Sequence, residues 1–134
     1  MQNAKCKVQN AKCKMENETK NLSERLLDFG VRIIKLTTKL NKTGVGRHIG
    51  DQLMRSATSS GANYEEACSA ESRADFVHKM QIVLKELRES LYWLKLLERS
   101  KLIPSEDLHP LLSEANELVK IVAKSVITAK SKGK

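Results

Sequence analysis

Apolar residues recur at helical spacing over most of this chain, and the clearest case lies in its middle. Steps of four and three residues separate Met80, Leu84, Leu87, Leu91 and Leu94. This is the spacing of a buried seam on an α-helix. The chain has only two prolines and six glycines among its 134 residues, so few residues interrupt such seams. We therefore expect long helices, and no competing pattern predicts a strand.

Four helices are predicted from this period and from the turn residues that separate them. Their expected ranges are 22–40, 45–68, 73–99 and 105–130. The first is expected to bury Leu22, Leu26, Leu27, Ile33, Ile34 and Leu40. Ser72, followed by Asp75, is typical of a capping box and predicts the start of the third helix. Pro110 leaves two alternatives for the fourth helix, a distorted first turn or a regular start near Pro110 itself.

Four amphipathic helices with short connections predict an all-α fold, an antiparallel up-down-up-down four-helix bundle. We expect residues 15–134 to form it as a single domain. The first 14 residues differ, because Gln2–Lys7 recurs as Gln9–Lys14, and this repeat is too short for a solenoid. We expect a disordered or non-native basic tail there, with Met15 as the native first residue. The alternative is a metal-binding or redox tail built on Cys6 and Cys13.

Positive charge is concentrated at the two ends of the chain. The formal net charge is +8, yet residues 16–119 carry a net charge of −1. Residues 120–134 contain no acid and five lysines: Lys120, Lys124, Lys130, Lys132 and Lys134. A basic helix end of this kind predicts contacts to the phosphates of RNA or DNA. The alternative, held equal to it, is that these lysines solubilise the helix end and complement its dipole.

Several classes of protein are disfavoured by the remaining pattern. No apolar run reaches the roughly 20 residues of a membrane span, and no signal peptide is visible. An odd number of cysteines without a CxxC pair fits a reducing, cytoplasmic location. Glu106-x-x-His109 and Asp75-x-x-His78 are weak relatives of the di-iron motif of helical bundles, so we expect no metal or other cofactor. The serines of the second helix have no histidine on that helix beyond the distant His48, and Cys68 lacks a local partner, so we expect no enzyme.

A glycine-rich segment, residues 44–50, precedes most of the second helix. No strand comes before it and no Gly-Lys-Ser/Thr follows, so neither a dinucleotide fingerprint nor a P-loop is supported. A helix N-terminus beside Arg47 and His48 could still hold a phosphate. Arg47 is therefore a weaker candidate for contact with nucleic acid.

A polar stripe runs along the second helix. Its members are Gln52, Ser56, Ser59, Asn63 and Glu66, at helical spacing, with Arg55 beside them. A solvated face is one interpretation, but such faces usually carry lysine and glutamate. We favour a buried or half-buried packing surface in which Arg55, Asn63 and Glu66 share a hydrogen-bonded network. Such groups specify register and oligomeric state, so we expect this stripe to support assembly of subunits.

The stripe also carries a resemblance to a known family. Gly46–Ala67, Ala70–Met80 and Lys85–Leu97 resemble the signature of the bacterial four-helix-bundle family named for the 23S rRNA intervening-sequence protein. The resemblance covers residues 22–129. It implies an antiparallel bundle that assembles into a ring, expected to be a homopentamer, with no enzymatic activity. The family name records where its genes were found, and no ribosomal role follows from it.

The resemblance extends to an accessory protein of diversity-generating retroelements, a pentameric barrel that binds nucleic acid and a reverse transcriptase. Two functions are therefore expected for this chain. The first is a non-enzymatic ring that binds RNA or DNA through the basic helix ends. The alternative is a protein-interaction scaffold or accessory subunit that binds no nucleic acid, consistent with the nearly neutral body.

Overall fold

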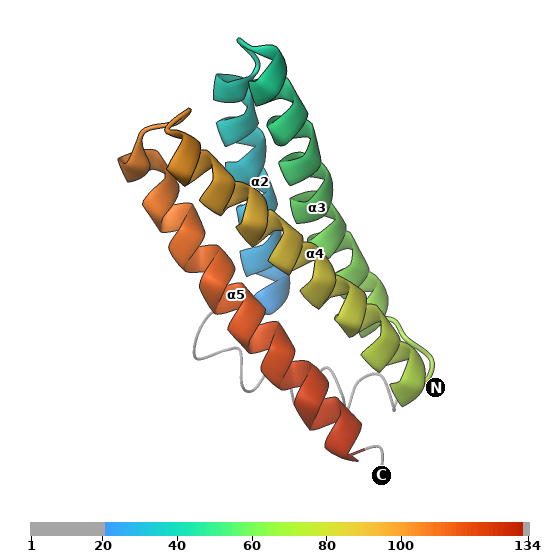
Figure 1. Cartoon of the computed structure of the whole chain (residues 1–134). Helices are drawn as coiled ribbons and strands as arrows, with labels where there is room; N and C mark the ends of the chain where they lie inside the picture. The colour runs from blue at the N-terminus through green and yellow to red at the C-terminus, as the bar shows by residue number, and fades with distance from the viewer. Residues whose placement is uncertain (1–20, 133–134) are drawn as a thin grey trace.

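The computed structural model describes residues 21–132 and shows four α-helices joined by short turns (Figure 1). They are α2 (Leu22–Leu40), α3 (Gly44–Cys68), α4 (Arg73–Ser100) and α5 (Ser105–Lys132). Every end lies within two residues of its predicted position. The predicted all-α four-helix fold is therefore confirmed. The expected tail of residues 1–14 lies outside the described residues.

The helices pair as two hairpins, one made of α2 and α3 and the other of α4 and α5 (Figure 1). α3 packs along both α2 and α4, and α5 packs along α4 but touches α2 over much less of its length. The bundle is therefore closed more tightly between its two middle helices than between α2 and α5.

Side chains at the helix starts bind the first backbone N–H groups. The Asn21 side chain accepts a hydrogen bond from Ser23 N at 2.7 Å. Thr43 accepts from Gly46 N at 2.9 Å. Ser72 accepts from Asp75 N at 3.0 Å, which confirms the predicted cap of α4. These local contacts explain why the sequence places the helix boundaries well.

Pro110 lies inside α5, which begins at Ser105 and continues through the proline. The first turn is tight, because the N–H of Asp107 donates to the carbonyl of Pro104 at 3.0 Å, three residues back. A proline cannot donate to the carbonyl four residues before it, so α5 lacks one bond at this point. The first alternative, an altered first turn, is the one that the structure favours.

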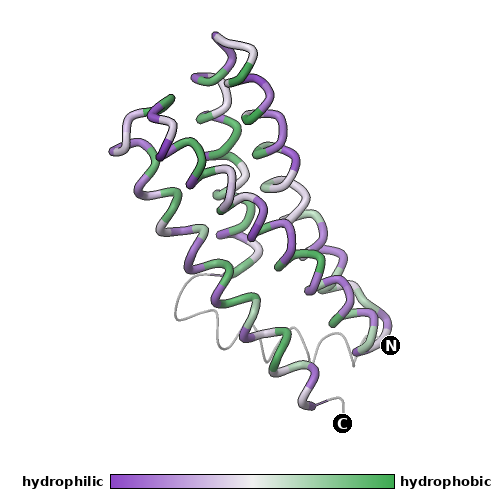
Figure 2. The backbone as a smooth tube through the Cα atoms, in the orientation of Figure 1, coloured by the Kyte–Doolittle hydropathy of each residue, from purple (hydrophilic) through white to green (hydrophobic). Residues whose placement is uncertain are grey.

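The core is built from the inner faces of all four helices, and Figure 2 shows apolar and polar residues interleaved along each of them. The predicted inner face of α2 is wrong at two positions, because Leu27 and Ile34 are exposed. Phe29 and Leu36 are buried instead, since they point to the same side as Leu26. No helix within residues 21–132 is long and apolar enough to cross a membrane.

Candidate functional site

The polar stripe of α3 faces α4 of the same chain at its centre. Ser56 and Ser90 are fully buried, and their hydroxyl oxygens lie 2.8 Å apart. Each hydroxyl also lies within hydrogen-bond distance of a carbonyl of its own helix, that of Leu53 for Ser56 and that of Glu86 for Ser90. Two small hydroxyl side chains thus satisfy each other where the helices meet, and they allow the two backbones to approach closely.

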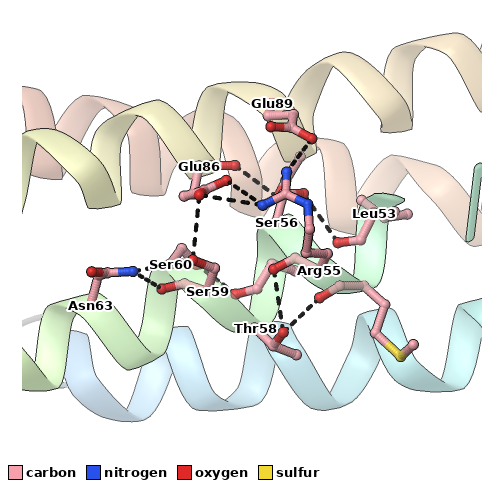
Figure 3. A network of polar contacts seen from close by, with 12 residues as sticks. Leu53, Arg55, Ser56, Thr58, Ser59, Ser60, Asn63, Glu86 and Glu89 are labelled. Carbon is pink, nitrogen blue, oxygen red and sulfur yellow. Dashed lines mark hydrogen bonds and ion pairs between the residues drawn. The ribbon is translucent and has the colours of Figure 1, made fainter. Parts of the chain in front are cut away.

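Arg55 lies beside this pair and connects α3 to two carboxylates of α4 (Figure 3). Its Nη1 lies 3.3 Å from Glu86 Oε1, and its Nη2 donates to Glu89 Oε2 at 2.5 Å. Glu89 Oε2 also accepts from Trp93 Nε1 at 3.1 Å. The hydrogen bond from Arg55, followed by that from Trp93, holds the pKa of Glu89 below its ordinary value. The bond to Glu89 in turn raises the pKa of Arg55.

The expected network of stripe residues is present in altered form. Ser59 Oγ donates to the buried Glu86 at 3.4 Å, and Asn63 donates to Ser59 Oγ at 3.1 Å. Arg55 and Asn63 are therefore linked through Glu86 and Ser59, as Figure 3 shows.

The two ends of the stripe lie outside this network. Glu66 is exposed and accepts from Lys79 Nζ at 2.7 Å, so it forms a separate pair with the start of α4. Gln52 is half-buried. All of these contacts lie within one chain, and the role of the stripe in assembly stays a prediction.

The lysines predicted to contact nucleic acid lie along the second half of α5. Lys120, Lys124, Lys130 and Lys132 are exposed, and none of them forms an ion pair with another residue of the described part of the chain. Lys134 lies outside the described residues. Arg47 is exposed near the opposite end of the bundle, where its Nη1 donates to the carbonyl of Asn41 at 3.1 Å. Arg47 therefore supports the turn between α2 and α3.

Arg25 is a residue that the sequence reasoning missed. Its buried side chain joins α2 to α5, donating to Glu114 through Nε at 3.1 Å and through Nη2 at 2.7 Å. Nη2 also donates to Glu117 at 2.9 Å. The bond to Glu114 is the main cause that raises the pKa of Arg25. Glu114 and Glu117 are three residues apart, which places them on one face of α5. This spacing was the feature of the sequence that could have indicated a site for an ion pair.

The histidines and carboxylates do not gather into a metal site within residues 21–132, where no group of three or more potential ligands lies together. His109 lies 3.2 Å from Glu98 and is exposed. His78 is also exposed, as its position opposite the apolar seam predicts.

Taken together, the fold and the contacts of α3 define an all-α bundle protein whose polar stripe joins its two middle helices. The model of the 23S rRNA-intervening sequence protein family matches residues 18–124, and the chain belongs to this family. The resemblance seen in the sequence is thereby confirmed.

The chain is also similar to a solved structure from Bacteroides thetaiotaomicron, described as a protein of unknown function from the S23 ribosomal protein family. The two are 38% identical with a TM-score of 0.73, over 79% of this chain and 98% of the other. Comparison with curated proteins finds no match.

Proposed function

We propose that this protein is a non-enzymatic, ring-forming bundle that binds RNA or DNA through the basic end of α5. The observation that carries the proposal is the set of four exposed lysines between Lys120 and Lys132, which have no ion-pair partner in the described chain. No acid follows Glu117 in the sequence, so no carboxylate on the same helix segment offsets them. Lysines of this kind release counterions from phosphates when they bind.

Self-association is supported by an apolar stripe on the outer face of α2. Leu27, Val31 and Ile34 lie at helical spacing and are 64%, 43% and 45% exposed. Soluble monomers rarely expose large contiguous apolar patches, and exposed apolar side chains that lie side by side favour association. Contact between copies would bury this stripe. A ring would also bring the α5 lysines of several subunits into one assembly, which raises the local positive potential.

The nucleic-acid part of the proposal is tested with paired charge variants of the full chain. Lys120→Gln with Lys124→Gln removes two charges from α5, and Lys35→Gln with Lys42→Gln removes two exposed charges elsewhere. Binding of labelled RNA is measured by fluorescence anisotropy over a range of salt concentrations. The α5 variant is expected to reduce the slope of log K against log salt by about 1.4, from about 0.7 per phosphate contact on a single strand. Equal effects of the two variants would contradict the assignment to α5.

The assembly part is tested by the mass of the protein in solution. Val31→Glu places a charge in the centre of the α2 stripe, and Ser113→Glu adds the same charge to an exposed position of α5. Light scattering after gel filtration is expected to show a smaller particle only for Val31→Glu. A monomeric wild-type protein would contradict the ring. Capture of a partner protein without any affinity for nucleic acid would favour the alternative, an interaction scaffold.

A further inference from the structure

A basic stripe with one aromatic residue runs along the outer face of α4. Helical steps of three and four residues separate its members, which are Lys85, Arg88, Tyr92, Lys95 and Arg99. All five side chains are exposed. At a rise of 1.5 Å per residue the stripe extends for about 21 Å along one side of the helix. It is distinct from the lysines of α5, which lie on another helix.

The four cations of this stripe are available for a ligand, because none of them forms an ion pair among residues 21–132. Glu86 lies on another side of the helix, whereas Glu89, four residues after Lys85, and Glu98, three residues after Lys95, border the stripe. Glu86 and Glu89 bind Arg55 of α3, and Glu98 lies beside His109 of α5. The charged members of the stripe itself are all positive, and the two acids that border it already have partners on other helices. A stripe of cations without ion-pair partners favours a polyanionic ligand.

Tyr92 gives the stripe a second kind of contact. The residue is 58% exposed, and its ring stands edge-on to Trp93, with ring centroids 5.2 Å apart and planes at 73°. Trp93 is itself anchored by its hydrogen bond to Glu89 and by an edge contact with His48. The tyrosine therefore rests on a fixed neighbour while much of its own ring remains open. An open aromatic ring between cations is the arrangement on which unpaired bases stack.

We propose that the α4 stripe binds single-stranded nucleic acid, with phosphates along its four cations and one base stacked on Tyr92. The inference rests on the proposed nucleic-acid function and adds to it a second surface and a class of substrate. A single strand is favoured over a duplex, because the faces of paired bases are covered by their neighbours in the stack. The positive charges hold the backbone without regard to sequence, so little base specificity is expected.

The test compares wild-type full-length protein with variants at exposed positions, using labelled single-stranded RNA of about 15 nucleotides and the matching duplex. Arg88→Gln with Lys95→Gln is expected to weaken single-strand binding and lower the salt slope by about 1.4. Lys35→Gln with Lys42→Gln is the control with equal charge change. Tyr92→Ala is expected to weaken single-strand binding about tenfold, with an unchanged salt slope and unchanged duplex binding. Tyr92→Phe retains the ring and is expected to bind as wild type.

The outcomes separate this inference from the function on which it rests. If Lys120→Gln with Lys124→Gln weakens binding while the α4 variant matches the control, the α4 stripe is overturned and the proposed function stands. If only the α4 variants weaken binding, the stripe is supported and the assignment to α5 fails. Equal loss of duplex and single-strand binding in Tyr92→Ala would overturn the stacked base. Absence of any binding by the wild-type protein overturns both proposals.

Discussion

Gly46 stands where the turn from α2 enters α3, and replacing it with alanine tests how closely these helices are joined. A Cβ at position 46 would lie 2.1 Å from the carbonyl oxygen of Leu40 and 2.9 Å from Oγ1 of Thr43. The Leu40 oxygen belongs to the backbone, so it cannot rotate away as a flexible side chain can. The Thr43 hydroxyl is the cap of α3 and accepts from Gly46 N. Gly46→Ala therefore forces the turn at residues 41–43 to move.

The expected magnitude follows from three opposing contributions. Alanine is favoured over glycine inside a helix by about 1 kcal/mol. Forcing a methyl group into a filled site costs about 1–3 kcal/mol, and a displaced cap costs about 1 kcal/mol more. We expect Gly46→Ala to lower the free energy of unfolding by about 2 kcal/mol. The sign is opposite to the one that helix propensity alone predicts.

Gly30 of α2 provides the matched control, because a Cβ built there meets nothing within 4 Å. Gly30→Ala is expected to raise the free energy of unfolding by about 1 kcal/mol. Urea unfolding followed by circular dichroism measures both variants, at one protein concentration because self-association changes the apparent stability. A midpoint for Gly46→Ala at or above that of wild type would refute the close contact. Destabilisation by Gly30→Ala would refute the open space beside α2.

Three further predictions concern single side chains. Arg25→Met leaves the half-buried Glu114 without its partner, and we expect it to lower the free energy of unfolding by about 2 kcal/mol. Urea unfolding measures this loss. The loss should be smaller when Arg25→Met is made in a Glu114→Gln background. Because the pKa of Glu89 is lowered in the folded state, its stabilisation is complete above the ordinary glutamate pKa of about 4.3 and is lost as pH falls through the lowered value. The difference in melting temperature between wild type and Glu89→Gln should thus be constant from about pH 6 to about pH 8 and shrink in acid. Lys101 has a left-handed backbone with φ of 59°, so Lys101→Gly should raise the melting temperature, and a decrease would argue against that conformation.

Helix boundaries were the part of the fold that the sequence predicted best, because caps and apolar spacing are local. The inner face of α2 was less well predicted. Leu26 and Leu27 are adjacent apolar residues, as are Ile33 and Ile34. Either member of each pair therefore fits the apolar period of the buried face. The packing of α2 against its neighbours, mainly α3, decides which member of each pair is buried. The exposed members then form the outer apolar stripe with Val31.

The partners of the polar residues could not be predicted, because they lie far away in the sequence. Ser56 meets Ser90, and Arg55 meets Glu86 and Glu89, across a helix pairing that no local pattern specifies. The basic stripe of α4 was hidden for a different reason. Acids and bases are interleaved along this helix, and only the structure shows that the bordering acids Glu89 and Glu98 are paired with Arg55 and His109.

The buried Ser56–Ser90 contact also limits how α4 can be aligned along α3. A shift of one helical turn, about 5.4 Å, would move the two hydroxyls apart. It would also leave Arg55 facing at most one of its two carboxylates, because Glu86 and Glu89 lie one turn apart. Each hydroxyl would keep its contact with the carbonyl of its own helix, so the shift would remove only the hydrogen bond between the two serines, a loss of about 1 kcal/mol. The apolar seam alone, which repeats every turn, would accept several such alignments. The serine contact and the ion pairs of Arg55 thus favour one alignment of α4 along α3 among those that the leucines would tolerate.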